Sequence, residues 1–314
     1  MMRTSDIKLV YYSEVKSKKV EWLWFPYIAF GRITIIQGDP GDGKTTLALM
    51  LVSMLSNGKN TYNVEGLKIK EPCNVIFQTA EDGVDDTIKP RLEIMNANCK
   101  RVAYLEDEKR LDLEDDSIEQ LIIQSKAKLF ILDPIQSFLG KGKSMQSVSD
   151  IRPMMKNLSK IAKRTNCAIV LIGHLNKCER TKDLYRGLGS IDITAIARSI
   201  LYVKRSKEKT NIRIINQIKN SIEKEGEPVA YELMDGAIRW LGVYKDEPLV
   251  LEELDKLDQA KEFLVELLED EMKTFNEISE LAKKNDISMR TITRAKKELA
   301  IISLRRNNQW YWKM

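Results

Sequence analysis

The stretch GDPGDGKTT at 38–46 limits the possible folds of this chain more than any other feature. It fits the pattern G-x-x-x-x-G-K-[ST], whose glycines let backbone N–H groups close around phosphate oxygens without a clash from a Cβ atom. The apolar run ITIIQG precedes the loop and a helical pattern follows it, as the motif requires. The amino end of that helix adds its positive dipole. The stretch therefore predicts a site for nucleotide phosphates.

We expect ATP at this site, together with Mg²⁺. Lys44 is predicted to reach the β- and γ-phosphates, and the hydroxyl of Thr45 is predicted to ligate Mg²⁺. The expected nucleotide-binding residues are Gly38, Asp39, Pro40, Gly41, Asp42, Gly43, Lys44, Thr45 and Thr46.

A second motif, KLFILDP, places the carboxylate of Asp133 at the end of an apolar run. In an open α/β sheet, ligands bind where the parallel strands end, so Asp133 is expected at the same crevice as the phosphate loop. We predict that Asp133 holds the Mg²⁺ shell through water. The next residue is Pro134 and not Glu, which disfavours ATPases that place their catalytic base directly after this Asp.

The catalytic base must then come from another strand. The run NVIFQTAED ends in Glu81 and Asp82, just past a strand that can lie beside the strand of Asp133. We predict that Glu81 is the general base that orients the attacking water. The alternative is an acid of a solvated loop.

A third strand end, AIVLIGHLNK, contains His174, the only histidine of the chain. At this position His174 can sense the γ-phosphate or bound nucleic acid, and a structural role is the alternative. Lys177 and Arg180 follow on the polar loop 175–190. They are predicted either to contact DNA or to be solvated.

Apolar runs alternate with helical patterns over most of the chain, which predicts βαβ units and an α/β fold with a mainly parallel sheet flanked by helices. The expected strands are 33–38, 74–79, 101–105, 128–133, 168–173, 199–203 and 212–218. The expected helices are 44–56, 85–95, 116–126 and 146–164. After Ala230 the pattern changes to an antiparallel hairpin that turns at Asp235-Gly236.

Changes in pattern divide the chain into two domains. The main domain is expected at 1–244, with an aromatic lead-in at 1–32. The run VEWLWFPY in this lead-in can pack against the main domain or form a flap over a nucleotide base. The charged segment 245–257 is expected to be a linker, and 258–314 a small second domain.

The second domain is predicted to be a winged helix-turn-helix, because three helical patterns precede a hairpin pattern. Its charge is strongly polarised: 283–314 holds nine basic and two acidic residues, whereas 258–280 holds two basic and eight acidic residues. Arg290, Arg294 and Lys297 share one side of the expected recognition helix and are predicted to contact duplex DNA. The alternative is a solvated basic helix in a domain that binds protein.

Composition adds little to these motifs. Apolar residues make up 43% and charged residues 31%, as in an ordinary globular protein, and a net charge of +5 is too weak to indicate nucleic acid by itself. The four cysteines show no CxxC pair and no metal spacing, which favours thiols in a reducing compartment. No leader or long apolar run is evident, so we expect a cytoplasmic protein without a membrane partner.

Together these pieces resemble the RecA-like ATPase superfamily, and more closely the hexameric plasmid replicative helicases of the RepA type with their phage and mobile-element relatives. The resemblance covers about 20–240. The segments with the resemblance are VEWLWFPYIAFGRITIIQGDPGDGKTT, FQTAED, LFILDP, GHLNK and RGLGSIDITAIARSI. The loop GKGKSMQSVSD at 140–150 departs from it; its Lys141 and Lys143 are expected either to line a central channel or to form a basic surface loop.

The resemblance implies roles for several residues. Lys44 and Thr45 correspond to the nucleotide-binding pair, Glu81 to the catalytic glutamate and Asp133 to the metal-site aspartate. His174 corresponds to a histidine that couples nucleotide state to the DNA-contacting loop. Arg198 corresponds to an arginine finger that reaches a neighbouring subunit, with Arg186 and Arg205 as rivals. A finger of this kind implies a ring or filament of identical subunits, expected to be a hexamer.

The sequence therefore predicts a DNA-dependent ATPase, a replicative helicase of a mobile element. Single-stranded DNA is expected at the core loops and duplex DNA at the second domain, with a primase or another replication protein as a further partner. Two alternatives stay open: an ATP-hydrolysing loader or recombination mediator that does not unwind DNA, and a DNA-binding regulator whose assembly is switched by ATP.

Overall fold

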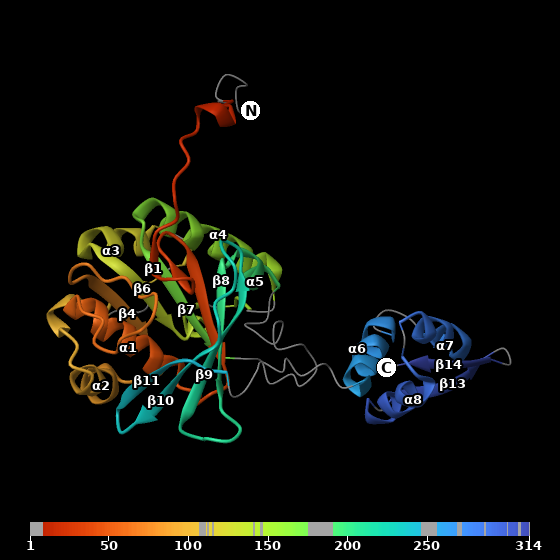
Figure 1. Ribbon diagram of the computed structural model, residues 1–314. Helices are drawn as coiled ribbons and strands as arrows, with labels where there is room; N and C mark the ends of the chain where they lie inside the picture. The colour runs from red at the N-terminus through yellow and green to blue at the C-terminus, as the bar shows by residue number, and fades with distance from the viewer. Residues whose placement is uncertain are drawn as a thin grey trace.

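The computed structural model has a large central sheet (Figure 1). It describes residues 9–106, 111, 113–114, 116–140, 142–144, 147–174, 191–245, 256–268, 272–285, 287–299, 301–306 and 309–313. Within these residues, nine strands form one sheet in the order β11-β10-β9-β8-β3-β7-β6-β4-β5. The strands from β8 to β5 in this order are parallel, and β9, β10 and β11 extend one edge in antiparallel fashion.

The parallel strands follow the expected apolar runs. Their bounds are β3 Ile33–Gly38, β4 Asn74–Thr79, β5 Val102–Ala103, β6 Ala127–Asp133, β7 Ala168–His174 and β8 Ser199–Arg205. The antiparallel strands are β9 Ile212–Asn220, β10 Val229–Met234 and β11 Ala237–Val243. Only β5 is clearly shorter than expected, because the pattern at 101–105 pairs with β4 at just Val102 and Ala103. The expected mainly parallel α/β sheet is confirmed.

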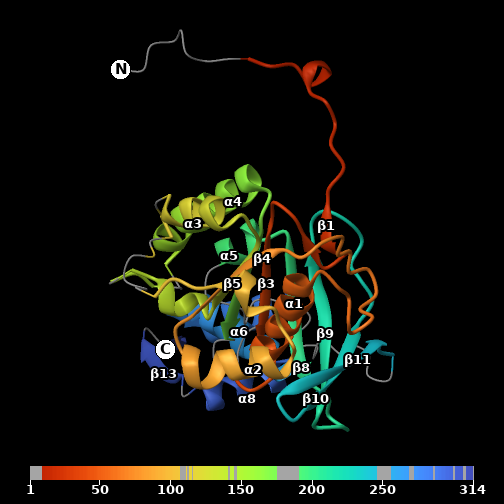
Figure 2. The same ribbon diagram turned by 90° about the vertical axis from the view of Figure 1, so that its left-hand side faces the viewer.

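Helices cover both faces of this sheet. They are α1 Lys44–Asn57, α2 Lys89–Ile94, α3 Ser117–Ser125, α4 Val148–Thr165 and α5 Ile191–Ile196. Side chains of β6 alternate between two cores: Leu129 and Ile131 pack with α1, whereas Phe130 and Leu132 pack with α3 and α4. Figure 2 shows α3 and α4 side by side on their face of the sheet. Burial on both faces explains why the strands are continuous apolar runs.

The helix predicted at 85–95 is divided in two. A turn of π-helix at Val84–Ile88 precedes α2, and Pro90 is the second residue of α2. Proline has no N–H and fits the first turn of a helix, where no intrahelical acceptor exists for that group. Pro90 therefore stands where a regular α-helix can begin.

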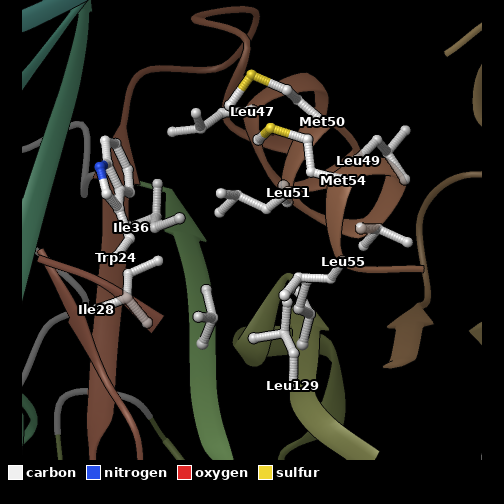
Figure 3. Close-up of a cluster of buried hydrophobic side chains, with 14 of the residues drawn as sticks. Trp24, Ile28, Ile36, Leu47, Leu49, Met50, Leu51, Met54, Leu55 and Leu129 are labelled. Atoms are coloured by element: carbon white, nitrogen blue, oxygen red, sulfur yellow. The ribbon is translucent and has the colours of Figure 1, made fainter. Parts of the chain in front are cut away.

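The aromatic lead-in packs against the main sheet. It forms β1 Trp22–Trp24 and β2 Ile28–Ala29, an antiparallel pair. Trp24 is fully buried beside Ile28 and Ile36, facing α1 (Figure 3). Its indole N–H donates to the carbonyl of Glu65 at 2.9 Å. Packing, one of the two predicted roles of this segment, is therefore confirmed for Trp24.

The C-terminal residues build their own small core. Their elements are α6 Lys256–Leu268, β12 Lys273–Thr274, α7 Phe275–Lys284, α8 Met289–Glu298, β13 Ile302–Arg306 and β14 Gln309–Lys313. Leu264, Ile278, Ile292 and Trp312 meet in a core that contains no residue of the large sheet. The three helices and the hairpin of β13 and β14 were predicted, whereas β12, which pairs with β14, was not, and α6 begins two residues before the expected boundary at 258. Residues 307–308, between β13 and β14, lie outside the described residues.

Two helices of this unit, α7 and α8, begin with a capping side chain. The hydroxyl of Thr274 accepts from the N–H of Glu277 at 3.2 Å, and Glu277 in turn accepts from the N–H of Thr274 at 2.7 Å. The hydroxyl of Ser288 accepts from the N–H of Thr291 at 3.2 Å. Such bonds satisfy N–H groups that have no partner inside a helix. None of the helices that the structure describes is long and apolar enough to cross a membrane.

Candidate nucleotide-binding site

The phosphate loop joins β3 to α1, as predicted. Gly41 and Gly43 adopt φ values of +80° and +83°, a left-handed conformation that L side chains rarely adopt. At Gly38, an added Cβ would lie 2.2 Å from the carbonyl oxygen of Val203. Glycine is therefore required for backbone conformation at two positions of the loop and for space at the third.

Lys44 lies inside this loop and is only 4% exposed. Its Nζ donates to the carbonyls of Gly38 at 2.9 Å and Asp39 at 2.8 Å. Burial lowers the pKa of Lys44, and the carboxylates of Asp42, Asp133, Asp39 and Glu81 oppose that shift. An ammonium group thus stands at the loop within electrostatic range of four carboxylates, including both predicted catalytic acids.

Thr45 and Asp133 face each other across the start of α1 and the end of β6. The hydroxyl of Thr45 donates to Oδ2 of Asp133 at 2.6 Å, and Asp133 is 5% exposed. Mg²⁺ prefers oxygen ligands and needs few protein groups when phosphates supply the others. Within the described part of the chain, no cluster of three or more His, Cys, Asp or Glu could hold a metal alone. Together with the ammonium of Lys44, this pair of oxygens fits Mg²⁺ bound to a nucleotide.

Glu81 follows β4, whose last residue pairs with the last residue of β6. Thr79 is the register partner of Asp133, and the N–H of Ala80 donates to the carbonyl of Asp133 at 3.2 Å. Asp82, the neighbouring acid, pairs with Arg91 at 3.4 Å. Glu81 is exposed and interacts electrostatically with Lys44. Of the two acids, Glu81 is therefore the one within electrostatic range of Lys44, whereas Asp82 is held by Arg91.

The third strand end reaches the same edge. The backbone of His174 ends β7 and is the register partner of Gly38. Lys177, Arg180 and Arg186 lie outside the described residues, and so does Lys141. Lys143, one of the predicted channel residues, forms an ion pair with Glu114 at 2.9 Å.

The candidate arginine fingers lie at opposite ends of β8. Arg198 precedes β8, and its N–H donates to the carbonyl of Ile33, where β3 begins. Arg205 ends β8, and its Nη2 lies 3.9 Å from the position that a Cβ on Gly41 would take. Arg198 therefore stands at the sheet edge away from its own phosphate loop, while Arg205 stands beside that loop. The role of Arg198 towards a neighbouring subunit stays a prediction.

Two residues at the loop were not predicted. Arg213 of β9 is 4% exposed, and its Nη2 donates to the carbonyl of Gly41 at 3.2 Å. Tyr231 of β10 is fully buried, and its hydroxyl donates to the carbonyl of Gly43 at 2.9 Å. No motif marks either residue, because each sits in an antiparallel strand far along the chain. The one feature of the sequence that could have pointed to Arg213 is a charged residue inside an otherwise apolar strand pattern.

The predicted DNA-contacting residues of α8 are exposed. Arg290, Arg294 and Lys297 lie on the side of α8 away from the small core. Arg294 also pairs with Glu298 at 3.4 Å. The fourth basic residue, Lys296, instead packs over the ring of Trp312, 4.4 Å from its centroid. Lys296 thus contacts the β-hairpin, whereas Arg290, Arg294 and Lys297 form a separate, exposed basic face of α8.

Comparison with known proteins adds relatives of this chain. The AAA domain family matches residues 8–180. The DNA repair protein RadA of Streptococcus pyogenes serotype M3 (strain ATCC BAA-595 / MGAS315) is 27% identical over 210 residues, which cover 66% of this chain and 40% of RadA. RadA of Aquifex aeolicus is 26% identical over 211 residues, covering 65% and 40%. The chain thus spans less than half the length of these relatives.

The larger unit was also compared with solved structures. The ATPase domain of G40P superposes with a TM-score of 0.53 at 16% identity, covering 67% of this chain and 84% of that domain. The RadB recombinase gives a TM-score of 0.49 at 16% identity, covering 68% and 92%. The likeness to the G40P domain, with the phosphate loop between β3 and α1, identifies the larger unit as a RecA-like P-loop fold, as predicted.

Proposed function

This chain belongs to the AAA domain family, and from that premise we propose that it is a DNA-dependent ATPase, a hexameric replicative helicase of a plasmid or phage type. The observation with most weight is the meeting of Lys44, Thr45, Asp133 and Glu81 at one sheet edge. The ends of three strands, β3, β4 and β6, bring together a cation, a metal-site pair and a carboxylate. This is the set that phosphoryl transfer requires.

Each residue has a distinct part in the proposed hydrolysis. Bound Mg²⁺ supplies positive charge that offsets the charge developing on the phosphates. Lys44 binds the β- and γ-phosphates, while Thr45 and Asp133 hold the metal shell. Glu81 orients the attacking water and accepts its proton. Glu81 lies within electrostatic range of Lys44, whereas Asp82 pairs with Arg91 away from it, which favours Glu81 for this role.

A neighbouring subunit completes the proposed site. Arg198 is the first candidate for a finger that stabilises transition-state charge, with Arg186 and Arg205 as rivals. Hydrolysis at subunit interfaces would then move the loops 140–150 and 175–190, with Lys177 and Arg180, along single-stranded DNA. His174 would couple the two events, since its backbone is paired with Gly38 at the phosphate loop.

Two observations support DNA as the partner. The relatives from Streptococcus and Aquifex are DNA repair proteins by name. The residues 258–314 also present Arg290, Arg294 and Lys297 on one exposed side of α8. We propose that 258–314 is a winged-helix domain for duplex DNA, joined by the linker 245–257 to an ATPase domain at 1–244.

A strand-displacement assay tests the helicase proposal. The full chain with ATP and Mg²⁺ is expected to separate a forked duplex, and its mass with a non-hydrolysable ATP analogue and DNA is expected to be six times that of the monomer. Hydrolysis that DNA stimulates without any strand separation would favour a loader or recombination mediator, the function class nearer to the names of the RadA relatives. Binding of ATP and DNA without hydrolysis would favour an ATP-switched regulator.

Replacing both Arg290 and Arg294 by Ala is expected to weaken binding to duplex DNA of any sequence. Each arginine that contacts a phosphate releases counterions, so the slope of log K against log salt should become shallower by about 2 for the double variant. Fluorescence anisotropy with a labelled duplex at several salt concentrations measures this slope.

The matched control removes two charges from the main domain. Lys68 and Lys70 are exposed there, and their replacement by Ala is expected to leave the slope unchanged. An unchanged slope in the Arg290 and Arg294 variant would refute duplex binding by α8. Equal changes in both variants would indicate that net charge, rather than this helix, attracts the duplex.

A further inference from the structure

Two antiparallel strands support the phosphate loop from the side of its carbonyl groups. In β9 and β10, Arg213 and Tyr231 are register partners. They donate to the carbonyls of Gly41 and Gly43, over separations of 172 and 188 residues along the chain. Both side chains are at least nine-tenths buried. The loop is therefore anchored by a part of the sheet that lies outside the parallel core.

The planarity of the peptide bond gives these contacts a directional effect. In a trans peptide unit, the carbonyl and the N–H of the next residue point in opposite directions. The carbonyl of Gly43 accepts from the N–H of Leu47 at 2.9 Å and from Tyr231, so Tyr231 adds a second bond that fixes this peptide. The N–H of the same peptide belongs to Lys44, is one of the first N–H groups of α1 and has no partner inside the helix. Such N–H groups at a helix start bind phosphate.

Arg213 acts on the preceding turn of the loop. Its Nη1 donates to the carbonyls of Thr210 at 2.6 Å and Ile212 at 3.2 Å, which fixes the guanidinium relative to β9. Its Nη2 reaches the carbonyl of Gly41, whose peptide partner, the N–H of Asp42, donates to the carbonyl of Asp39 at 3.2 Å. Arg213 thus holds the turn in which Asp39 and Asp42 stand.

The side chains of Tyr231 and Arg213 occupy the space beside Gly43 that a larger side chain would need. An added Cβ on Gly43 would lie 2.8 Å from the hydroxyl of Tyr231 and 3.5 Å from Cγ of Arg213. Burial raises the pKa of the Tyr231 phenol, so the hydroxyl keeps the proton that it donates. Glycine at position 43 therefore leaves the space that the hydroxyl of Tyr231 needs to donate to the loop.

We infer that Arg213 and Tyr231 are positioning residues of the nucleotide site: Arg213 holds the turn of the loop at Gly41, and Tyr231 holds the carbonyl of Gly43 so that the N–H of Lys44 faces the phosphates. This inference rests on the proposed binding of ATP. The two residues act through Gly41 and Gly43 and do not themselves touch the nucleotide. Their loss should weaken binding of substrate and transition state alike, which raises KM without a matching fall in kcat.

Tyr231→Phe tests the inference, because it removes one hydroxyl and leaves the ring. The dissociation constant for a fluorescent ATP analogue and the KM for ATP are expected to rise together by about tenfold, as for a lost hydrogen bond to a buried carbonyl. The kcat is expected to stay within about threefold. Arg213→Lys, which keeps a cation near Gly41, should bind ATP more tightly than Arg213→Met.

Tyr244→Phe is the matched control. Tyr244 is also buried, 8% exposed, and packs with Ile212 and Ala230 of the same strands, away from the loop. Its replacement should leave ATP binding unchanged. The inference is overturned if Tyr231→Phe lowers only the melting temperature, or if Tyr244→Phe weakens ATP binding as much. Failure of the wild-type protein to bind ATP would instead refute the proposed function, so the two failures are distinguishable.

Discussion

Replacing Glu81 by Gln is expected to lower kcat for ATP hydrolysis by about 10²–10⁴-fold, while ATP still binds. Gln keeps the size of the side chain and can still accept a hydrogen bond, but it cannot take the proton of the attacking water. Glu81 is within electrostatic range of Lys44 and adjoins the strand pair that ends in Thr79 and Asp133. Steady-state hydrolysis with and without DNA, together with equilibrium binding of an ATP analogue, measures both quantities.

Asp82→Asn is the control for this experiment. Asp82 is the adjacent acid of the same loop, and its carboxylate pairs with Arg91. Its replacement should disturb that pair and change kcat by far less than the replacement of Glu81. If the Glu81 variant hydrolyses ATP at the wild-type rate, the proposed base is wrong and the helicase proposal loses its chemical step. If Asp82→Asn has the larger effect, the roles of the two acids are exchanged.

The parallel part of the fold could be predicted because its strands are buried on both faces. Leu129, Phe130, Ile131 and Leu132 read as one apolar run, since alternate residues enter the two cores. The parallel arrangement of these strands also predicted the position of the nucleotide site. Parallel strands end at one edge, so polar residues that follow apolar runs, such as Asp133 and Glu81, are expected to meet there.

The parts that could not be predicted depend on contacts between distant segments. Arg213 and Tyr231 approach the loop only because β9 and β10 extend the sheet beyond β8. No local pattern reports which strands are neighbours. The same reasoning applies to Lys143, for which the sequence left open a channel or a basic surface loop: no local pattern indicates its ion pair with Glu114. Polar residues that follow apolar strands can be recognised in the sequence as candidate site residues. The residues that hold the phosphate loop in place, such as Arg213 and Tyr231, can be recognised only from the tertiary structure.

The second large effect is expected for Mg²⁺ affinity when the proposed metal site is changed. Replacing Asp133 by Asn is expected to weaken the apparent affinity for Mg²⁺ in ATP hydrolysis by about 10–100-fold, as for other residues that orient a metal ligand. The carboxylate of Asp133 accepts from the hydroxyl of Thr45 at 2.6 Å, which directs the oxygen of Thr45. Asn lacks the charge that attracts a divalent ion. Titration of Mg²⁺ at saturating ATP measures the change.

Two variants of Thr45 test whether its hydroxyl is needed for Mg²⁺ affinity, and a variant of a distant acid tests whether any loss of negative charge has the same effect. Thr45→Ser keeps the hydroxyl that donates to Asp133 and is expected to retain most Mg²⁺ affinity, whereas Thr45→Val should lose it as the Asp133 variant does. Asp116→Asn serves as the charge control, because this acid is exposed and pairs with Arg164 at 3.5 Å. Unaltered Mg²⁺ dependence in Asp133→Asn would place the metal elsewhere. Thr45 is the second residue of α1 and Asp133 is the last residue of β6, so the Mg²⁺ site would in that case not depend on the contact between these two elements.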